Sequence, residues 1–327
     1  MNVDEIRRLL ARRSIIARAV GLVLAVALGY KLWATVATNG WTSDLTERFQ
    51  TLLSPSSLGI IIGLVTINVL LEGSKWYWLL QGVMDRRWGD CVRDVLLGWG
   101  MGLLTPYRLG ELVGRPMLLP SQARAIGLQR MGWNSLIQTA VTIAGALPAL
   151  YLLLSSGGLF VFPMGFSFKV GWMLLGVLAL LGVGYLLWRA VSVSMAGRWP
   201  VAWKRMGKSP SLRQLAVVSA LAVLRYLVYM VLFAYLLDVM VPGKSLMHWM
   251  AALPLVFLLQ TVVPIPGWLG FAARIEWAVL ILQHYGAEVE GIALASALTW
   301  VLNLLVPALV GSVWFALQAP SIRTAHA

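Results

Sequence analysis

Long apolar runs, separated by short polar segments, make up most of this chain. Several of them have the length of about 20 residues that a helix needs to cross a bilayer. These runs cover approximately residues 19–37, 58–81, 133–154, 170–188, 214–237 and 291–317. The pattern predicts an all-α, polytopic integral membrane protein with one transmembrane domain over residues 1–327.

Two further apolar runs, over residues 95–104 and 249–263, are too short to cross a bilayer and end near helix-breaking residues. Irregular backbone at membrane depth must be buried in protein or line a water-filled cavity. We therefore expect two re-entrant hairpins that enter the membrane from opposite sides. Their tips are expected at Thr105, Pro106, Pro264, Pro266 and Gly267. For the first run, an ordinary cytoplasmic loop with a salt bridge is the alternative.

The order of these segments repeats along the chain. Residues 1–156 follow the order span, span, hairpin, span, and residues 157–327 follow the same order with opposite sidedness. The second half is therefore predicted to be inverted relative to the first. Pro106 and Pro264 take corresponding places, and such paired broken helices indicate a transporter binding site at the bilayer midplane.

Composition agrees with a membrane location and narrows the classes of function. The chain is 59% hydrophobic and 12% charged, whereas soluble domains average about 25% charged residues. Its net charge of +13 gathers in loops such as residues 189–213, which predicts cytoplasmic N- and C-termini rather than nucleic-acid binding. The single cysteine and three scattered histidines predict no metal site. No catalytic motif is present, so we expect neither an enzyme nor a cofactor.

The charged residues within the predicted membrane segments are the candidate functional residues, because a charge at membrane depth is costly unless it is paired or faces a polar cavity. Arg108, Glu111 and Arg115 follow the first hairpin tip at spacings that place them on one helical face. Asn68, Glu72 and Lys75 have helical spacings in the second span. For Glu72 and Lys75, an intrahelical ion pair near the helix end is the alternative.

The second half of the chain supplies fewer charged candidates. Arg225 lies near the middle of a predicted span with no acidic residue within four positions, so we expect its partner on another helix. Whether Arg225 serves structural pairing or ligand contact is left open by the sequence. Arg274 and Glu276 follow the second hairpin tip, and Asn303 lies in the last span.

The excess of arginine over acid in this set favours an anionic ligand, because guanidinium groups bind phosphate through two parallel hydrogen bonds. A lipid phosphate is the anion most available inside a membrane. We expect Arg108 and Arg115 to bind the phosphate and Glu111 to orient them or to contact a cationic head group. The complete set of candidate lipid-binding residues is Arg108, Glu111, Arg115, Glu72, Lys75, Asn68, Arg225, Arg274, Glu276 and Asn303.

The segment Thr105-Pro106-Tyr107-Arg108-Leu109-Gly110-Glu111, with Arg115 after it, resembles a "TP-x-R-x-GE-x-x-x-R" signature. This signature is typical of the flippase-like transmembrane domain of lysylphosphatidylglycerol synthase and its stand-alone relatives. Further similar motifs follow in the same order along almost the whole chain. They are Asn68-x-x-x-Glu72-x-x-Lys75-Trp76, Leu224-Arg225-Tyr226, Pro264-Ile265-Pro266-Gly267 and Trp300-x-x-Asn303-Leu304-Leu305-x-Pro307.

The resemblance implies a bacterial inner-membrane protein that moves a polar lipid between leaflets, without the soluble domain that aminoacylates the lipid. One departure is Trp268, which replaces a glycine that many relatives carry before the acidic residue of the second hairpin. The expected ligand is a membrane phospholipid or a lipid-linked glycan. No ATPase motif is present, so we expect a downhill or ion-driven process.

Two alternatives to a flippase follow from the same residues. One is a lipid-binding subunit that presents lipid to a separate synthase or glycosyltransferase without transporting it. The other is an intramembrane transferase, which would need a donor site that no loop in the sequence is large enough to build. No motif indicates an oligomeric state.

Overall fold

The structure is a computed structural model that describes residues 43–103, 109–155, 209–262, 270–283 and 288–323. Within these ranges the regular secondary structure is helical and contains no strand. The expected spans at residues 19–37 and 170–188 lie outside the described residues. The same holds for Arg108 and for the expected hairpin tips Thr105, Pro106, Pro264, Pro266 and Gly267.

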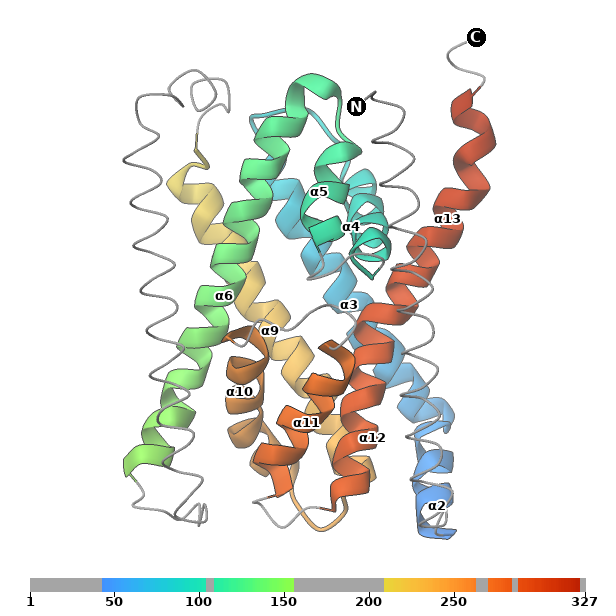
Figure 1. Cartoon of the computed structure of the whole chain (residues 1–327), viewed down its shortest axis with the longest axis vertical. Coiled ribbons are helices and arrows are strands. Elements are labelled where there is room, and N and C mark those ends of the chain that lie inside the picture. Colours follow the sequence, from blue (N-terminus) through green and yellow to red (C-terminus); the bar gives the residue numbers. More distant parts are fainter. Residues whose placement is uncertain (1–42, 104–108, 156–208, 263–269, 284–287, 324–327) are drawn as a thin grey trace, which may run out of the picture.

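Long helices run along the vertical axis of Figure 1. They are α3 (Pro55–Leu80), α6 (Arg124–Ser155), α9 (Leu212–Met240) and the continuous unit of α12 (Val289–Trp300), a π-helical turn (Val301–Leu305) and α13 (Val306–Arg323). Helix α3, helix α9 and the segment Val289–Trp314 are long and apolar enough to cross a membrane. The chain is therefore a helical membrane protein, as the apolar runs predicted.

Shorter helices fill the space between the long ones. Helices α4 (Trp88–Leu103) and α5 (Leu109–Met117) pack together in the upper half of Figure 1, and α10 (Leu246–Val262) and α11 (Gly270–Leu282) pack together in the lower half. Helix α2 (Ser43–Leu52) and a short 3-10 helix (Ser121–Ala123) complete the described elements. The short apolar runs of the sequence thus form α4 and α10, and α4 begins several residues earlier than predicted.

The first turns of α3 and α9 are fixed by their own sequences. Before α3, the Ser54 side chain accepts a hydrogen bond from the backbone N–H of Ser57, and Pro55 fits the first helical position. Helix α9 begins with a capping box formed by Ser211 and Gln214. Gln214 also donates to the carbonyl oxygens of Trp78 and Gln81 at 3.0 and 2.7 Å, so the start of α9 is tied to the end of α3.

Helices α4 and α5 approach closely because glycines lie between them. Gly98 and Gly102 of α4 face α5, and Gly114 of α5 faces α4. A Cβ atom at Gly98 would lie 2.6 Å from Cγ of Arg115, and one at Gly114 would lie 2.7 Å from the sulfur of Met101. Small residues at such contacts let helix backbones meet within a membrane. The close approach places the Arg115 side chain inside the protein.

Gly98→Ala should destabilise the protein by about 1–3 kcal/mol, because the added methyl group overlaps the buried Arg115 stem. Thermal unfolding of the purified protein in detergent measures this change. Gly132→Ala in α6 is the matched control, since a Cβ there meets nothing within 4 Å. Equal unfolding temperatures for the two variants would contradict the close packing of α4 on α5.

Candidate functional site

The buried carboxylate of Glu72 on α3 is the centre of a polar cluster. Glu72 is 2% exposed. Its Oε1 accepts hydrogen bonds from Nη1 of Arg115 at 2.8 Å and from Nδ2 of Asn134 at 2.9 Å. Its Oε2 accepts from Nζ of Lys75 at 3.0 Å and lies 3.3 Å from Nη1 of Arg225. One side chain therefore connects α3 with α5, α6 and α9.

A second carboxylate, Glu111 on α5, extends the cluster to α4. Its Oε1 accepts from Nη2 of Arg115 at 2.6 Å and from the indole N–H of Trp99 at 3.0 Å. Arg115 is fully buried, and both terminal nitrogens of its guanidinium group are engaged by carboxylates. The helical spacing of Glu111 and Arg115 is thereby confirmed, with the two side chains forming an i,i+4 ion pair on α5.

Arg225 on α9 stands at the border of this cluster. Its Nη1 donates to Oε1 of Gln138 at 3.2 Å, and the same oxygen accepts from Lys75 at 2.9 Å. The guanidinium carbon lies 5.8 Å from the ring centroid of Trp99, which is within cation–π range. The prediction that Arg225 finds its acidic partner on another helix is confirmed, and the partner is Glu72.

Positive charge exceeds negative charge in this cluster. Within the described part of the chain, Lys75, Arg115 and Arg225 face the carboxylates of Glu72 and Glu111. Charged side chains inside a membrane protein are tolerated when they are paired and hydrogen-bonded. Arg115 and Lys75 make hydrogen bonds of 2.6–3.0 Å to these carboxylates, whereas Arg225 lies 3.3 Å from Glu72 and makes the longest ion pair of the three cations.

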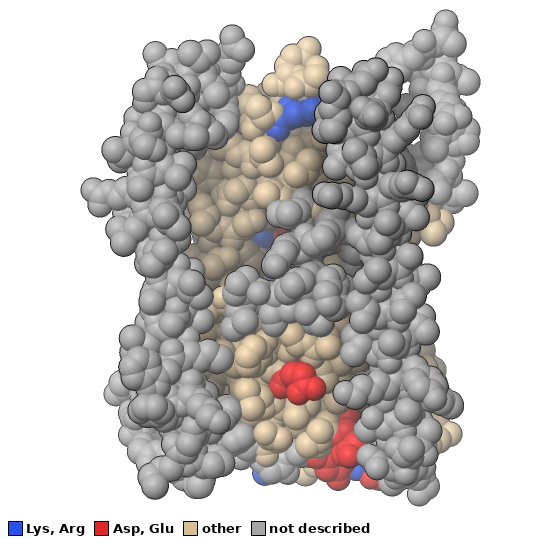
Figure 2. Space-filling model, in the orientation of Figure 1, with Lys and Arg blue, Asp and Glu red and all other residues tan. Residues whose placement is uncertain are grey.

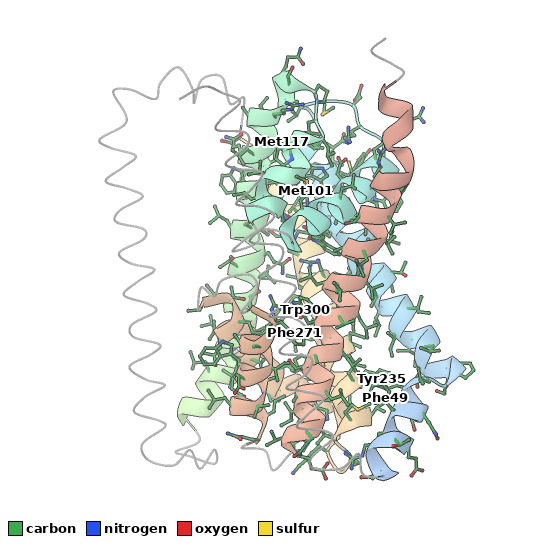
Figure 3. The ribbon with its side chains drawn as sticks, turned by 45° about the vertical axis from the view of Figure 1, so that its right-hand side comes forward. Phe49, Met101, Met117, Tyr235, Phe271 and Trp300 are labelled. Atoms are coloured by element: carbon green, nitrogen blue, oxygen red, sulfur yellow. The ribbon has the colours of Figure 1, made fainter. Side chains whose placement is uncertain are left out.

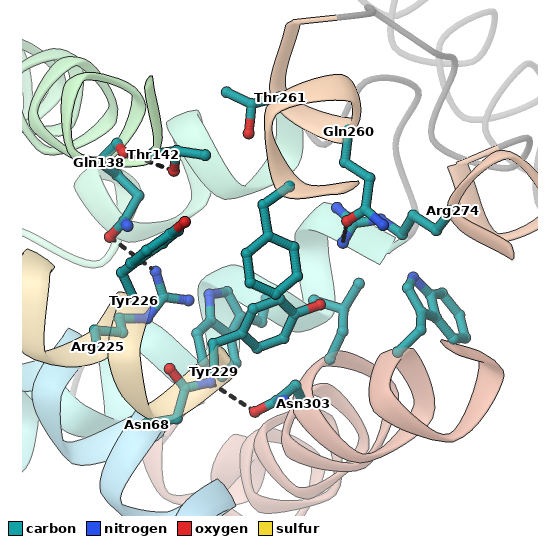
Figure 4. A pocket seen from close by; sticks show the side chains of 14 residues that line it. Asn68, Gln138, Thr142, Arg225, Tyr226, Tyr229, Gln260, Thr261, Arg274 and Asn303 are labelled. Atoms are coloured by element: carbon teal, nitrogen blue, oxygen red, sulfur yellow. Dashed lines mark hydrogen bonds between the residues drawn. The ribbon is translucent and has the colours of Figure 1, made fainter. Parts of the chain in front are cut away.

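A cavity of about 170 Å³ adjoins the cluster at Arg225. Arg225 and Arg274 supply its charged groups, and among the described residues no carboxylate lines it. Its uncharged polar side chains are Asn68, Gln138, Thr142, Gln260 and Thr261, together with Asn303. Its aromatic side chains are Trp99, Tyr226, Tyr229, Phe257 and Trp300. In Figure 4, Arg225 and Arg274 lie on opposite sides of the cavity, with Tyr229 between them.

The cavity lies far from both ends of the long helices. Asn68 is near the middle of the 26-residue α3, and Arg225 is near the middle of the 29-residue α9. At 1.5 Å per residue, each is about 20 Å from its helix end, which corresponds to the central part of a bilayer. Trp300 and Phe271 lie side by side at the same level in Figure 3, with ring centroids 4.9 Å apart.

Several buried polar atoms at the cavity have no hydrogen-bond partner within the described chain. Nδ2 of Asn68 donates to Oδ1 of Asn303 at 2.7 Å. The other side-chain atoms of this pair, Oδ1 of Asn68 and Nδ2 of Asn303, are unpaired, as are Nε of Arg225 and the hydroxyl of Tyr226. Buried polar groups are normally satisfied. These atoms are therefore exceptions to that rule within the described part of the chain.

Asn303 is presented by an irregular turn of its helix. Residues Val301–Leu305 form a π-helical turn in which the N–H of Val306 bonds to the carbonyl of Val301. Pro307 has no N–H and cannot bond to the carbonyl of Asn303, which favours the irregularity. Such turns occur frequently at functional sites.

The structure brings most of the predicted site residues together. Glu72, Lys75, Glu111 and Arg115 form the buried cluster, whereas Asn68, Arg225, Arg274 and Asn303 line the cavity. Arg274 also donates to Gln260 at 3.4 Å. Glu276 is exposed on α11 and is not among the residues that line the cavity.

Arg115 has a different place from the one expected of a phosphate ligand, because its terminal nitrogens are held by Glu72 and Glu111. Asn134 and Gln138 on α6 contact the cluster directly and were not predicted from the sequence. Their spacing of four within an apolar run was a usable signal, since it places two amides on one helical face.

No family model matches this chain, and no curated protein is detectably similar to it in sequence. Within the described residues, no group of three or more side chains of the metal-binding types gathers at one place. The chemistry that the site offers is recognition: guanidinium and amide donors beside aromatic rings, in a cavity at mid-membrane depth.

Glu72→Ala should lower the free energy of unfolding by about 3–5 kcal/mol, because it leaves Lys75, Arg115 and Arg225 without their shared counter-charge. Thermal unfolding in detergent is the measurement, with the exposed Glu47→Ala as the control. Adding Lys75→Met should recover part of the loss, since fewer buried cations then remain unpaired. A Glu72→Ala variant as stable as Glu47→Ala would contradict the central role of Glu72.

Proposed function

We propose that this protein is a flippase-like transporter that moves a polar, phosphate-bearing lipid between the leaflets of a bacterial cytoplasmic membrane. The observation that carries the proposal is the cavity at mid-membrane depth, where Arg225 and Arg274 are present and no described carboxylate is. Guanidinium groups bind phosphate through two parallel hydrogen bonds, and phosphate is the anion that membrane lipids commonly carry. A lipid head group crossing the membrane would need such partners at this depth.

Arg225 and Arg274 are the phosphate ligands in this proposal. Arg225 is 23% exposed and shares its Nη1 between Gln138 and Glu72, so an arriving phosphate competes for it with Glu72. Arg115 acts as a positioning residue, since it fixes Glu72 and Glu111 from within the core. Arg108 is proposed as a further phosphate ligand, as expected from the sequence.

The contact pattern between helices supports an inverted repeat of residues 1–156 and 157–327. Helix α4 packs on α3, α5 and α13, and α10 packs correspondingly on α9, α11 and α6. The two short pairs lie in opposite halves of the molecule (Figure 1). These features fit two re-entrant hairpins from opposite sides, an architecture that places a transporter site at the midplane.

The charge distribution supports the proposed orientation. On the face shown in Figure 2, the largest basic patch lies near the upper end and most of the acidic surface lies toward the lower end, where smaller basic patches are also visible. By the positive-inside rule, the upper end faces the cytoplasm. We include two further features in the same proposal. The N- and C-termini are cytoplasmic, and the chain belongs to the flippase-like family that the Thr105–Arg115 segment resembles.

The rigid contacts around Glu72 favour a second candidate function. Side chains from α3, α5, α6 and α9 hold the Glu72 carboxylate in place. Such a fixed arrangement suits a site that binds lipid and presents it to a separate synthase or glycosyltransferase. In this case the cavity would bind the same phosphate-bearing lipid without carrying it across.

Arg225→Gln and Arg274→Gln should each slow lipid movement about tenfold or more, because each removes a charge-assisted hydrogen bond to phosphate. The measurement is leaflet access of fluorescent phosphatidylglycerol and of a polyprenyl phosphate in reconstituted vesicles. Arg213→Gln, at an exposed position on the same helix as Arg225, is the matched control and should move lipid at the wild-type rate.

Wild-type rates in both cavity variants, with the fold intact, would overturn the proposal. Lipid binding by the wild-type protein without any movement would favour the presenting function instead.

A further inference from the structure

We propose that Gln138 of α6 is a positioning residue that holds Arg225 against the Glu72 cluster and gives it up to a phosphate that binds in the cavity. Binding in the cavity and the contacts of the buried cluster therefore depend on each other. This inference rests on the proposed function, in which Arg225 is a phosphate ligand, and adds the residue that controls where Arg225 lies.

The amide of Gln138 lies between the cavity and the buried cluster. Its Oε1 accepts a hydrogen bond from Nζ of Lys75 at 2.9 Å and another from Nη1 of Arg225 at 3.2 Å. Lys75 is fully buried in the cluster, whereas Gln138 and Arg225 both line the cavity (Figure 4). One oxygen atom therefore joins the two parts of the site.

Four polar atoms at this boundary form a closed ring in which cationic donors and oxygen acceptors alternate. They are Nζ of Lys75, Oε2 of Glu72, Nη1 of Arg225 and Oε1 of Gln138. The two sides of the ring at Lys75 measure 2.9 and 3.0 Å, and the two sides at Arg225 measure 3.2 and 3.3 Å. Because the longer contacts are the weaker ones, the ring opens most easily at Arg225.

A phosphate that binds Arg225 opens this ring. A guanidinium group binds phosphate through two of its nitrogen atoms, and Nε of Arg225 is buried, so the two terminal nitrogens are the ones that a phosphate engages. Nη1 then leaves Gln138 and Glu72. Lys75 keeps its bonds to both oxygens, so neither acceptor loses its last partner and the change costs the cluster little.

The strength of the contact at residue 138 sets the balance between these two arrangements. A group that holds Arg225 more strongly in the ring weakens phosphate binding, and a group that holds it less strongly favours binding. A carboxylate at this position would form a charge-assisted bond about twice as strong as that of the neutral amide, and an apolar side chain would form none. The glutamine is therefore intermediate between a fixed and a released Arg225.

Two substitutions of Gln138 test the proposal, because each should move stability and binding in opposite directions. The unfolding temperature in detergent reports stability. Binding of phosphatidylglycerol in detergent micelles is followed by tryptophan fluorescence, since Trp99 and Trp300 line the cavity. A glutamine with a purely structural role would change stability and binding in the same direction or leave binding unchanged.

Gln138→Met should bind phosphatidylglycerol about fivefold more tightly, because Arg225 loses a neutral acceptor that competes with phosphate. The same variant should unfold at a lower temperature, since Lys75 and Arg225 then share one acceptor fewer. If Gln138 instead contacted the ligand directly, its replacement by methionine would weaken binding.

Gln138→Glu should bind phosphatidylglycerol about tenfold more weakly, because its carboxylate pairs with Arg225 and competes with phosphate. Its unfolding temperature should be at least as high as that of the wild type, since the added negative charge lies beside Lys75 and Arg225. Gln50→Met and Gln50→Glu, the same changes at an exposed site on α2, are the controls and should alter neither quantity.

The wild-type protein and Arg225→Gln separate this inference from the proposed function. Binding by the wild type that Arg225→Gln weakens about tenfold supports the phosphate ligand on which both rest. Equal or weaker binding by a folded Gln138→Met protein would then overturn the inference and leave the proposed function intact. If Gln138→Met does not fold, wild-type affinity in Gln138→Glu would overturn the inference. Absence of binding by the wild type would overturn both.

Discussion

The carboxylate of Glu72, held inside the membrane by cations from several helices, is the contact on which the described structure depends. A buried ion pair does not by itself prove stability, because both partners lose their hydration. Removing one partner is nevertheless costly, since it leaves a buried charge without compensation. Glu72 receives hydrogen bonds from α3, α5 and α6 and lies 3.3 Å from the guanidinium of Arg225 on α9. The relative positions of these helices are therefore coupled through one side chain.

The same cluster explains why a cavity with positive character exists beside it. Arg115, Lys75 and Asn134 donate hydrogen bonds to Glu72, and Arg225 lies 3.3 Å from it and also lines the cavity. Arg274 enters from α11, in the same half of the chain as Arg225, and the irregular turn at Asn303 adds an amide group. Cluster and cavity together place a buried network of paired charges beside a cavity that Arg225 and Arg274 line.

The sequence predicts local features of this arrangement better than contacts between helices. Apolar runs predicted α3, α9 and the last long helical unit, and residue spacing predicted the Glu72–Lys75 and Glu111–Arg115 pairs. These features depend only on helical periodicity. The place of Arg115 depends on how closely α5 approaches α4 across Gly98, which no spacing within one helix reveals. The same reason explains why Glu72 was not identified as the partner of Arg225.

An experimental structure in lipid nanodiscs that contain phosphatidylglycerol tests the central claim most directly. The account predicts a phosphate within hydrogen-bonding distance of Arg225 or Arg274, with Arg115 still bound to Glu72 and Glu111. Phosphate groups found only at the two membrane surfaces, with the cavity filled by acyl chains or side chains, would contradict it.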